Sequence, residues 1–507
     1  MNGVLRARWR GLAVLVLVAA AWLAGSVVVA SAGADGPAAG DPAAGDPAAG
    51  APALDEHLSG GATTVVADTG RNAFSHPARN LSVDRQTPFF IGNSFFRKNW
   101  VEAPASTTGR DGLGPHFLAR SCAGCHLLDG RAAPPQVRDG WNVEQPVGLL
   151  LRLSIPATAQ RPAGKAGVVP DPVYGAQFEN SAVAGVSPEG RVAIEYIEQP
   201  GRFDDGTPYS LRQPVYHLRE LAYGPTHPEL LVSPRIAPAI IGMGLLEAIP
   251  EADLRAIAAH QAAAGGTISG RLNRVWDAGR QDWVVGRFGW KANVGTVRHQ
   301  TASAFNGDMG ITSSLFPSES CMPAQADCRA RQQREAHWRQ ERGEPPVDID
   351  DRALDRTVFY TMTLAVPGRR DLDDALVQQG ERLFHAAQCA SCHLPRHVTG
   401  ELPGFPELSG QTIRPYTDLL LHDMGEGLAD GRPDFDADGR EWRTPPLWGV
   451  GLLRAVNGHS YLLHDGRARS LMEAILWHGG EAEPSKQQVL GMSKAEREAL
   501  IRFLESL

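Results

Sequence analysis

Cysteine is scarce in this chain of 507 residues, which contains only six. That scarcity excludes a small disulfide-stapled scaffold, because such domains are short and rich in cysteine. A large excess of charge of one sign is also lacking, since the chain has 49 Lys and Arg and 57 Asp and Glu, which gives a net charge of −8. Nothing in this balance suggests a nucleic-acid partner. Beyond the N-terminus no apolar run is long enough to span a membrane, which excludes a polytopic membrane protein.

The first 32 residues have the layout of a secretory signal peptide. Arg6, Arg8 and Arg10 precede an apolar run that ends in small residues at 30–32, as at a cleavage site. Cleavage removes three Arg and no acid, so the net charge moves from −8 to −11. We therefore expect export to the periplasm. Because the run approaches the roughly 20 residues that cross a bilayer, an uncleaved N-terminal membrane anchor is the alternative.

The rest of the chain reads as a linker followed by mainly helical structure. Residues 33–60 are rich in Gly, Asp, Pro and Ala, a composition typical of a flexible tether. Apolar spacing predicts helices over 373–388, 470–478 and 493–507. Alternating residues over 191–198, with a second candidate strand over 210–218, predict an antiparallel hairpin.

Four of the six cysteines lie in two C-x-x-C-H runs, CAGCH over 122–126 and CASCH over 389–393. This spacing suits covalent c-type haem, because two thiols bind the vinyl groups and the adjacent His ligates the iron. A zinc site from two such pairs usually places them about 15–20 residues apart, and a thioredoxin-like pair does not require the His. The sequence therefore predicts two covalent c-type haems, held by Cys122, Cys125, Cys389 and Cys392 and ligated by His126 and His393.

The remaining cysteines, Cys321 and Cys328, enclose the six residues MPAQAD. In an oxidising compartment a local disulfide is the favoured interpretation. A reactive dithiol is the alternative, although no basic residue lies between the two thiols to lower their pKa.

Several longer runs resemble a known family. The runs SCAGCHLLDGR, GLLEAIPE, FGWKAN, FNGDMGIT, YTDLLLHDMGEGL, REWRTPPLWGVGL and LLHDGRARSLMEAILWHGGEA are similar to those of the bacterial di-haem oxidoreductase family. Its members are described as peroxidases, are sometimes labelled thiol oxidoreductases, and are distant relatives of the di-haem cytochrome c peroxidases. The resemblance covers roughly residues 85–507.

The resemblance implies a sixth ligand for the C-terminal haem. In the peroxidase relatives, that ligand stands fourteen residues after the His of a His-x-Gly segment. Here the segment contains His464, and fourteen residues later stands His478, where the relatives have Met or Tyr. Two imidazoles favour a low-spin electron-transfer centre. Met424 and His422 are the alternative ligands.

The resemblance also implies distal residues for the N-terminal haem. The relatives place a Trp between the haems, a Gln ten residues later and an acid beyond it. This sequence offers Trp290 as an electron relay, Gln300 at the same spacing and Asp308 eight residues further on, with Glu247 as a second acid. An acid and an amide over an open iron suit peroxide cleavage. Four histidines could instead close that iron: His217, His227, His260 and His299.

Two further expectations concern ions. Asp434, Asp436 and Asp438 begin like a calcium loop, but Pro445 stands at position twelve, so only an irregular calcium site is possible there. The peroxidase relatives hold calcium between their haems, which here would fall around residues 459–461. The haem propionates need cationic partners, and the candidates are Arg396, Arg467 and Arg469.

These inferences combine into a mainly α protein with two cytochrome-c-like haem domains, long loops and a small antiparallel β insertion. The N-terminal haem domain spans 61–365, with the insertion at about 131–285, and the C-terminal haem domain spans 366–507. We expect an oxidoreductase that reduces hydrogen peroxide, or another small oxidant, at the N-terminal haem. Its electrons would come from a small redox protein or a quinol-linked donor. Long-range oxidation of Trp, Tyr or thiol groups in a partner protein, and pure electron transfer, are the alternatives.

Overall fold

The structure, a computed structural model, describes residues 55–107, 109–138, 141–142 and 147–507. The predicted signal peptide and most of the predicted linker lie outside these residues. Within the described ranges, no helix is both long and apolar enough to cross a membrane. About 33% of the described residues are helical, and the strands form small antiparallel sheets. This agrees with the expected fold class at that coarse level, whereas the division into two haem domains stays a prediction.

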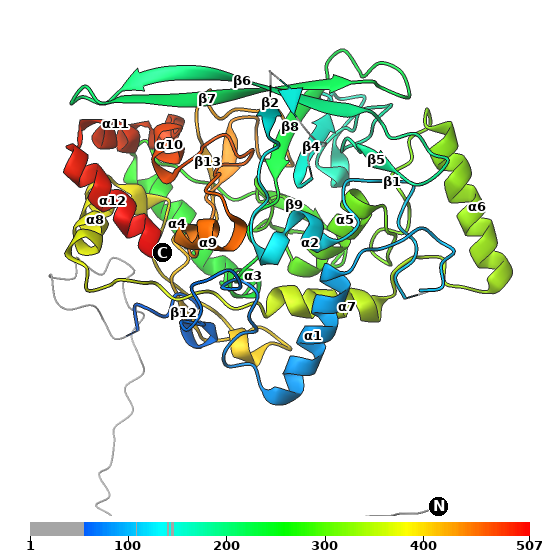
Figure 1. The fold of residues 1–507 in the computed structure, drawn as a ribbon, viewed down its shortest axis with the longest axis horizontal. Helices are drawn as coiled ribbons and strands as arrows, with labels where there is room; N and C mark the ends of the chain where they lie inside the picture. The colour runs from blue at the N-terminus through cyan, green and yellow to red at the C-terminus, as the bar shows by residue number, and fades with distance from the viewer. Residues whose placement is uncertain (1–54, 108, 139–140, 143–146) are drawn as a thin grey trace, which may run out of the picture. The chain divides into compact units, whose positions relative to one another are not determined.

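Twelve α-helices occur in the described part of the chain. Their bounds are α1 Val83–Arg97, α2 Cys122–Cys125, α3 Met243–Glu247, α4 Glu251–Ala264, α5 Val297–Met309, α6 Ala326–Arg342, α7 Asp351–Met362, α8 Ala375–Ala386, α9 Leu453–Asn457, α10 Leu471–Leu476, α11 Glu483–Gly491 and α12 Lys494–Ser506. Helices α8, α10 and α12 confirm the three helices that apolar spacing predicts. Helices α1, α5, α6 and α7 gather on one side of the described unit, and α8 with α10 to α12 on the other (Figure 1).

A pair of crossing helices accompanies each C-x-x-C-H motif. Helix α1 precedes the first motif and packs on α7, while α8 precedes the second and packs on α12. Each crossing is close because it contains a glycine. A Cβ on Gly92 would lie 2.0 Å from the carbonyl oxygen of Arg356, and one on Gly380 would lie 2.0 Å from that of Ala499.

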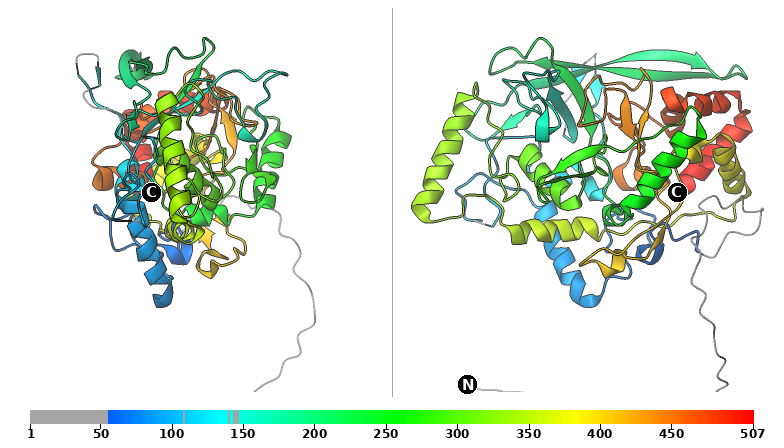
Figure 2. Two further views of the ribbon diagram at one scale, coloured as in Figure 1. Left: turned by 90° about the vertical axis from the view of Figure 1, so that its right-hand side faces the viewer. Right: turned by 180° about the vertical axis from the view of Figure 1, so that it is seen from behind.

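Strands in the described residues pair two by two, always antiparallel. The pairs are β1 His116–Phe117 with β5 Ser181–Ala182, β2 Val137–Arg138 with β3 Trp141–Asn142, β4 Leu149–Ser154 with β8 Leu231–Ile236, β6 Arg191–Arg202 with β7 Pro208–Arg219, β9 Arg274–Asp277 with β10 Asp282–Val285, β11 His397–Val398 with β12 Thr412–Ile413, and β13 Leu421–Asp423 with β14 Glu441–Arg443. The hairpin β6–β7 confirms the predicted hairpin, in the register Arg191 opposite Arg219, and extends along one edge of the unit (Figures 1 and 2).

Cys321 and Cys328 form a disulfide at the start of α6, which confirms the favoured interpretation of this pair. Cys328 is buried, with 1% of its surface exposed, and α6 itself lies at one end of the described unit (Figure 2). The other four cysteines are free. They are therefore available for the bonds that the C-x-x-C-H motifs predict.

Candidate functional site

A cavity of about 720 Å³ reaches both C-x-x-C-H motifs. Its lining includes Cys122, Cys125, His126, Cys389, Cys392 and His393. Burial raises the pKa of the Cys125 and Cys389 thiols to about 12, so neither is a free thiolate at neutral pH. A mostly apolar enclosure with a few placed polar groups is the usual character of a cofactor site.

The two motif histidines are oriented in the same way by backbone carbonyls. Nδ1 of His126 lies 2.7 Å from the carbonyl oxygen of Pro238, and Nδ1 of His393 lies 3.0 Å from that of Tyr416. Because a carbonyl only accepts, Nδ1 carries the hydrogen and Nε2 keeps its lone pair. Burial lowers the pKa of both imidazoles, that of His393 to about 4. Both are therefore neutral, which is the state that ligates a metal.

His478 has the same arrangement at the C-terminal end of α10. Its Nδ1 lies 2.7 Å from the carbonyl oxygen of Ala474, so its Nε2 is likewise free. The side chain lines the cavity, and burial lowers its pKa. Protonation of His478 would further lower the pKa of His393, in addition to the effect of burial. The two histidines of the predicted bis-His site therefore line the same cavity, and the ligand assignment stays a prediction.

His422, the alternative ligand, is already engaged at both ring nitrogens. Nδ1 lies 2.7 Å from Glu481 Oε2, and Nε2 lies 2.9 Å from Asp418 Oδ2. Although burial lowers its pKa, hydrogen bonds to Asp418, Cys392 and Glu481 raise it well above the usual value. An imidazolium donates from both nitrogens and has no lone pair for iron. Met424 lines the cavity and stays the other alternative.

Gln300 and Asp308 both lie on α5 and both line the cavity. Asp308 Oδ1 accepts a hydrogen bond of 3.1 Å from Gln177 Nε2 and lies 3.9 Å from an Arg152 nitrogen. Burial raises the pKa of Asp308, whereas Arg152 and Gln177 lower it. The Asp308 charge in turn raises the pKa of Cys122 and Cys125. The predicted distal acid therefore lies near the first motif, in a setting where it can exchange a proton.

Glu247 has a different position from the one that its predicted role requires. It is absent from the cavity lining, and its Oε2 accepts a 2.6 Å hydrogen bond from the backbone nitrogen of Val297. Val297 is the first residue of α5, where backbone N–H groups lack helical partners. Glu247 therefore holds the helix that carries Gln300 and Asp308, and we assign it a positioning role.

Aromatic side chains line the cavity as well. Trp290 is 8% exposed and donates from Nε1 to the carbonyl oxygen of Ile236 at 2.8 Å. Trp442 stacks on His464 with ring centroids 3.8 Å apart, and both also line the cavity. The sequence singled out Trp290 by its spacing to Gln300, but it gave no signal for Trp442.

Of the four histidines considered as closing ligands for the N-terminal iron, His299 alone lines the cavity. Its Nδ1 lies 3.6 Å from Asp277 Oδ2. His217 has 39% of its side chain exposed and His260 is exposed, and His227 is also absent from the lining.

The cations in the cavity differ from the arginines that the sequence suggested. Arg396, Arg467 and Arg469 are absent from its lining, and Arg467 pairs with Asp465 at 2.8 Å. Arg131 and Arg443 line the cavity instead, and their guanidinium groups donate to backbone carbonyls. Burial lowers the pKa of both to about 10, so both stay charged and can pair with propionates.

Arginine and lysine side chains of the protein itself donate hydrogen bonds to the oxygens of the candidate calcium loop. Asp434 accepts hydrogen bonds from Arg235 at 2.9 Å and Arg432 at 3.1 Å. The Lys291 ammonium, with its side chain fully buried, donates to Asp430 Oδ1 and to the carbonyl oxygens of Arg432 and Asp438. Among the described residues, the one group of three with metal-ligand geometry is Cys392, Asp418 and His422. Calcium at the Asp434 loop is therefore unsupported.

The residues present fit two haems, because each motif offers free thiols, a neutral His with a free Nε2 and buried cations within one cavity. Fold and site thus define a haem redox protein. A sequence model of the family described as "Di-haem oxidoreductase, putative peroxidase" matches residues 54–507. The chain belongs to this di-haem oxidoreductase family, as its motifs predict.

Two further similarities are more distant. A 62-residue segment, 11% of the chain, is 42% identical to cytochrome c4 of Stutzerimonas stutzeri and covers 29% of that protein. The hydrazine synthase of Kuenenia stuttgartiensis aligns over 90% of this chain and 100% of its own, with 14% identity and a TM-score of 0.29. That score is too low to support an argument about fold.

Proposed function

We propose that this protein is an exported di-haem c-type oxidoreductase that reduces hydrogen peroxide at its N-terminal haem with electrons that enter at its C-terminal haem. The observation that carries the proposal is the unlike surroundings of the two motifs. In the cavity His478 offers a free Nε2 and shares the lining with His393. Asp308, whose charge raises the pKa of Cys122 and Cys125, and Gln300 supply a carboxyl and an amide group from α5. When bound, the haems supply the electron storage and the iron chemistry.

Each residue of the site would have a separate role in peroxide reduction. His126, His393 and His478 would hold the irons through Nε2, and Trp290, which lines the cavity that reaches both motifs, would relay electrons between them. The overall reaction consumes one peroxide, two electrons and two protons and yields two waters, so the O–O bond breaks and two O–H bonds form. Asp308 takes a proton from one peroxide oxygen and returns it to the leaving oxygen, which general acid–base catalysis accelerates by about 10²–10⁴. Gln300 orients the oxygen that leaves.

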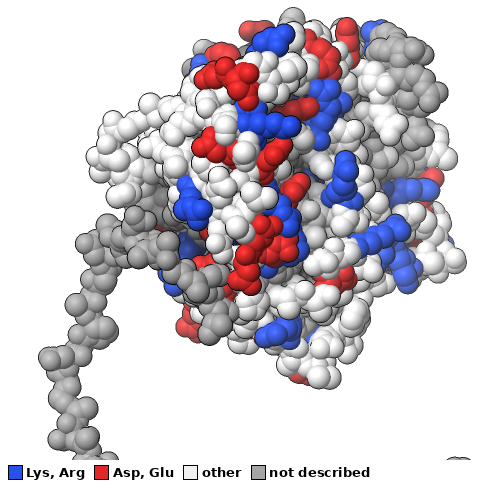
Figure 3. All heavy atoms as spheres, turned by 60° about the vertical axis from the view of Figure 1, so that its left-hand side comes forward, with Lys and Arg blue, Asp and Glu red and all other residues white. Residues whose placement is uncertain are grey.

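Two equivalents of a one-electron donor complete the balance, and a small redox protein fits that class. The predicted mature charge favours a donor with a basic face. On the face in Figure 3, basic and acidic side chains are intermingled. The charges on that face therefore do not make a continuous patch of one sign.

Electron paramagnetic resonance of the oxidised, haem-loaded protein tests the proposal. We expect one low-spin signal from the His393/His478 site and one high-spin signal that changes when peroxide is added. His478→Ala should abolish the low-spin signal, whereas Asp308→Asn should keep both signals and lower peroxide turnover by about 10² or more. Two low-spin signals without peroxide reactivity would identify a pure electron-transfer protein. Reactivity without turnover of any small reductant would favour oxidation of a partner protein.

A further inference from the structure

Two carboxyl groups that the proposed function does not use lie deep behind Asp308. Glu179 is 3% exposed and Glu189 is 2% exposed, and neither forms an ion pair with Lys or Arg among the described residues. Burial of an unpaired carboxylate is costly, so such groups need a compensating role or a bound proton.

The inner contact joins Asp308 to Glu179 through one amide. Gln177 Nε2 donates to Asp308 Oδ1 at 3.1 Å and to Glu179 Oε1 at 2.9 Å. The second oxygen of Glu179, Oε2, is buried and has no hydrogen-bond partner. A buried polar atom of this kind is rare and calls for a proton or a water molecule. Glu179 Oε2 is therefore able to hold a proton or bind a water molecule, and Glu179 is linked through Gln177 to Asp308, which lines the cavity.

The middle contact joins Glu179 to Glu189. Glu189 Oε2 accepts a 2.6 Å hydrogen bond from the backbone nitrogen of Glu179, and its Oε1 accepts one of 2.5 Å from Gln325 Nε2. Burial raises the pKa of Glu179, and the charges of Glu189 and Asp308 raise it further. Three mutually repelling carboxyl groups in one buried region cannot all be ionised at neutral pH. At least one proton is therefore held between them.

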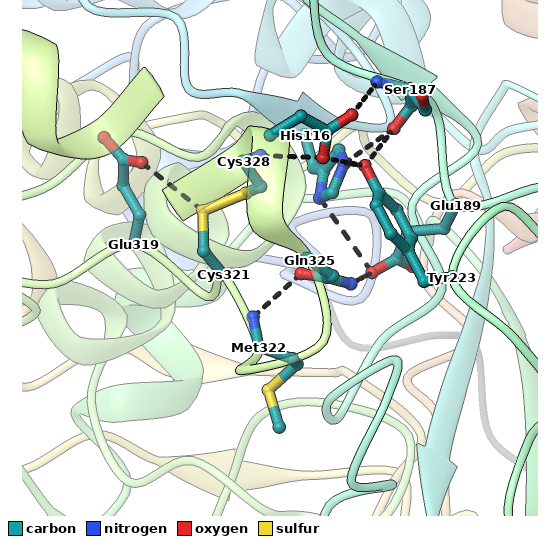
Figure 4. Close-up of a disulfide and its surroundings, with 10 residues drawn as sticks. His116, Ser187, Glu189, Tyr223, Glu319, Cys321, Met322, Gln325 and Cys328 are labelled. Atoms are coloured by element: carbon teal, nitrogen blue, oxygen red, sulfur yellow. Dashed lines mark hydrogen bonds and ion pairs between the residues drawn. A yellow bond between two sulfur atoms is a disulfide. The ribbon is translucent and has the colours of Figure 1, made fainter. Parts of the chain in front are cut away.

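The outer contacts lead from Glu189 to solvent. His116 Nδ1 lies 4.0 Å from Glu189 Oε1, and its Nε2 lies 3.2 Å from the hydroxyl of Tyr223. That hydroxyl donates to Asp327 Oδ1 at 2.7 Å, with the Ser187 carbonyl as a second acceptor at 2.7 Å. Figure 4 shows His116, Glu189 and Tyr223 converging beside the disulfide. Tyr223 and Asp327 are only partly buried, so the series of contacts reaches the surface.

The disulfide fixes the outer end of this series. The loop that Cys321 and Cys328 close contains Gln325, which contacts Glu189, and Asp327, which contacts Tyr223. Both groups are thus held by a covalent link at the start of α6 (Figure 4).

We propose that these groups form a proton path from the protein surface to the cavity, and that its members in order are Asp327, Tyr223, His116, Glu189, Glu179 and Asp308. The inference rests on the proposed function, because peroxide reduction consumes two protons inside a mostly apolar cavity. Tyr223 and His116 each have two acceptors within reach, so small rotations pass a proton on. The 4.0 Å step between His116 and Glu189 needs such a rotation or a bridging water. The steps from Glu189 to Glu179 and from Glu179 to Asp308 also need a bridging water, because the N–H groups that join these carboxyl groups keep their hydrogens.

The charges that face the path set its pH dependence. Gln325 and His116 face Glu189. Burial raises the pKa of Glu189 to about 8, and the charge of Asp171 contributes to this rise. Arg152 faces Glu179 and lowers its pKa. A carboxyl group that titrates near neutral pH can both accept and release a proton there.

The test measures proton uptake, separately from turnover, in the haem-loaded protein. An electron added in the cavity raises the proton affinity of Asp308, so chemical reduction in weakly buffered solution should take up protons, detected with a pH indicator. Glu189→Gln and Glu179→Gln should slow this uptake on the order of tenfold or more. Each variant should also lose a band of protonated carboxyl groups from the infrared difference spectrum. Unchanged haem absorption confirms that the variants fold.

Glu319→Gln is the matched control. Glu319 is partly buried, its pKa is raised by burial to about 9, and it lies 3.9 Å from the Cys321 sulfur, yet it contacts no member of the path. Its replacement should leave proton uptake unchanged. Uptake at the wild-type rate in both path variants, equal slowing in Glu319→Gln, or no uptake by the wild-type protein would each overturn the proton path. Slowed uptake in the path variants together with a wild-type protein inert to peroxide would support the path and reject peroxide reduction.

Discussion

The imidazole of His464 stacks on the indole of Trp442, with ring centroids 3.8 Å apart and ring planes only 9° from parallel. Both rings line the cavity that reaches the two C-x-x-C-H motifs, as does Trp290. Burial lowers the pKa of His464 to about 4, so the stacked imidazole is neutral. The cavity lining therefore contains a second aromatic group, the stacked pair of Trp442 and His464, in addition to Trp290, which the sequence indicated.

Replacement of Trp442 by Leu should slow electron transfer between the haems and leave the spectrum of each haem unchanged, because no predicted iron ligand is altered. The loss of the stacked pair should also lower the free energy of unfolding by about 0.5–1.5 kcal/mol beyond the lost burial. Rapid reduction followed at wavelengths that separate the two haems measures the rate. Trp338→Leu, on α6 and outside the cavity lining, is the control, and equal rates in both variants would remove Trp442 from the electron path.

Replacement of His422 by Ala should destabilise the protein without changing the ligands of either iron. The imidazolium of His422 compensates Asp418, whose side chain is fully buried, and Glu481, whose side chain is 13% exposed. Removal of one partner from such a buried pair costs about 3–5 kcal/mol. Denaturant unfolding gives this cost, and the low-spin resonance signal should persist. Loss of that signal in His422→Ala, with retention in His478→Ala, would reverse the assignment of the sixth ligand.

The buried ammonium group of Lys291 stabilises the fold by pairing with a buried carboxylate. It lies 2.9 Å from Asp430 Oδ1, with both side chains almost fully buried. We expect Lys291→Met to lower the free energy of unfolding by about 3–5 kcal/mol, because it leaves the Asp430 carboxylate unpaired. Lys494→Met, which breaks the exposed pair with Glu498, should cost at most about 1 kcal/mol.

The same lysine predicts the response to chelators. The Lys291 ammonium donates hydrogen bonds to three oxygens of this loop. Because these oxygens already contact a cation, neither EDTA nor added calcium should shift the thermal midpoint of the wild-type protein. A calcium-dependent rise of several degrees would show that a cation binds, either near Asp434 or at the second candidate position around residues 459–461.

Local sequence patterns predicted the parts of the site that depend on local spacing. The C-x-x-C-H motifs fix the positions of four thiols and two histidines, and the pattern before the second motif predicted α8. The fourteen-residue spacing from His464 to His478 comes from one turn and one short helix, so the family resemblance was enough to select it. Gln300 and Asp308 likewise belong to a single helix, α5.

Contacts between distant segments could not be predicted in this way. The hydrogen bond from Gln177 to Asp308 joins residues 131 positions apart, and that from Gln325 to Glu189 joins residues 136 apart. No periodicity of the sequence indicates that these side chains meet. The same is true of Arg131 and Arg443, whose role depends on a cavity that exists only after folding. Buried polar groups are selected by tertiary packing, and a single sequence shows only their identity.

Glu189 also predicts how stability changes with pH. Its pKa is raised, first by burial, to about 8 in the folded protein, whereas a Glu in the unfolded chain titrates near about 4.3. Between these values the folded state holds one more proton than the unfolded state. The contribution of Glu189 is therefore present below about pH 4.3 and is lost as the pH rises through about 8, by up to about 5 kcal/mol.

Glu189→Gln should remove this loss, because the neutral amide has no proton to release. The variant should gain stability relative to the wild-type protein as the pH is raised from about 5 to about 9, and thermal unfolding across that range measures the difference. Glu498→Gln, at an exposed position of α12, should follow the wild-type curve throughout. If Glu189→Gln and the wild-type protein kept parallel curves, Glu189 would be ionised at neutral pH and could not deliver a proton toward Asp308.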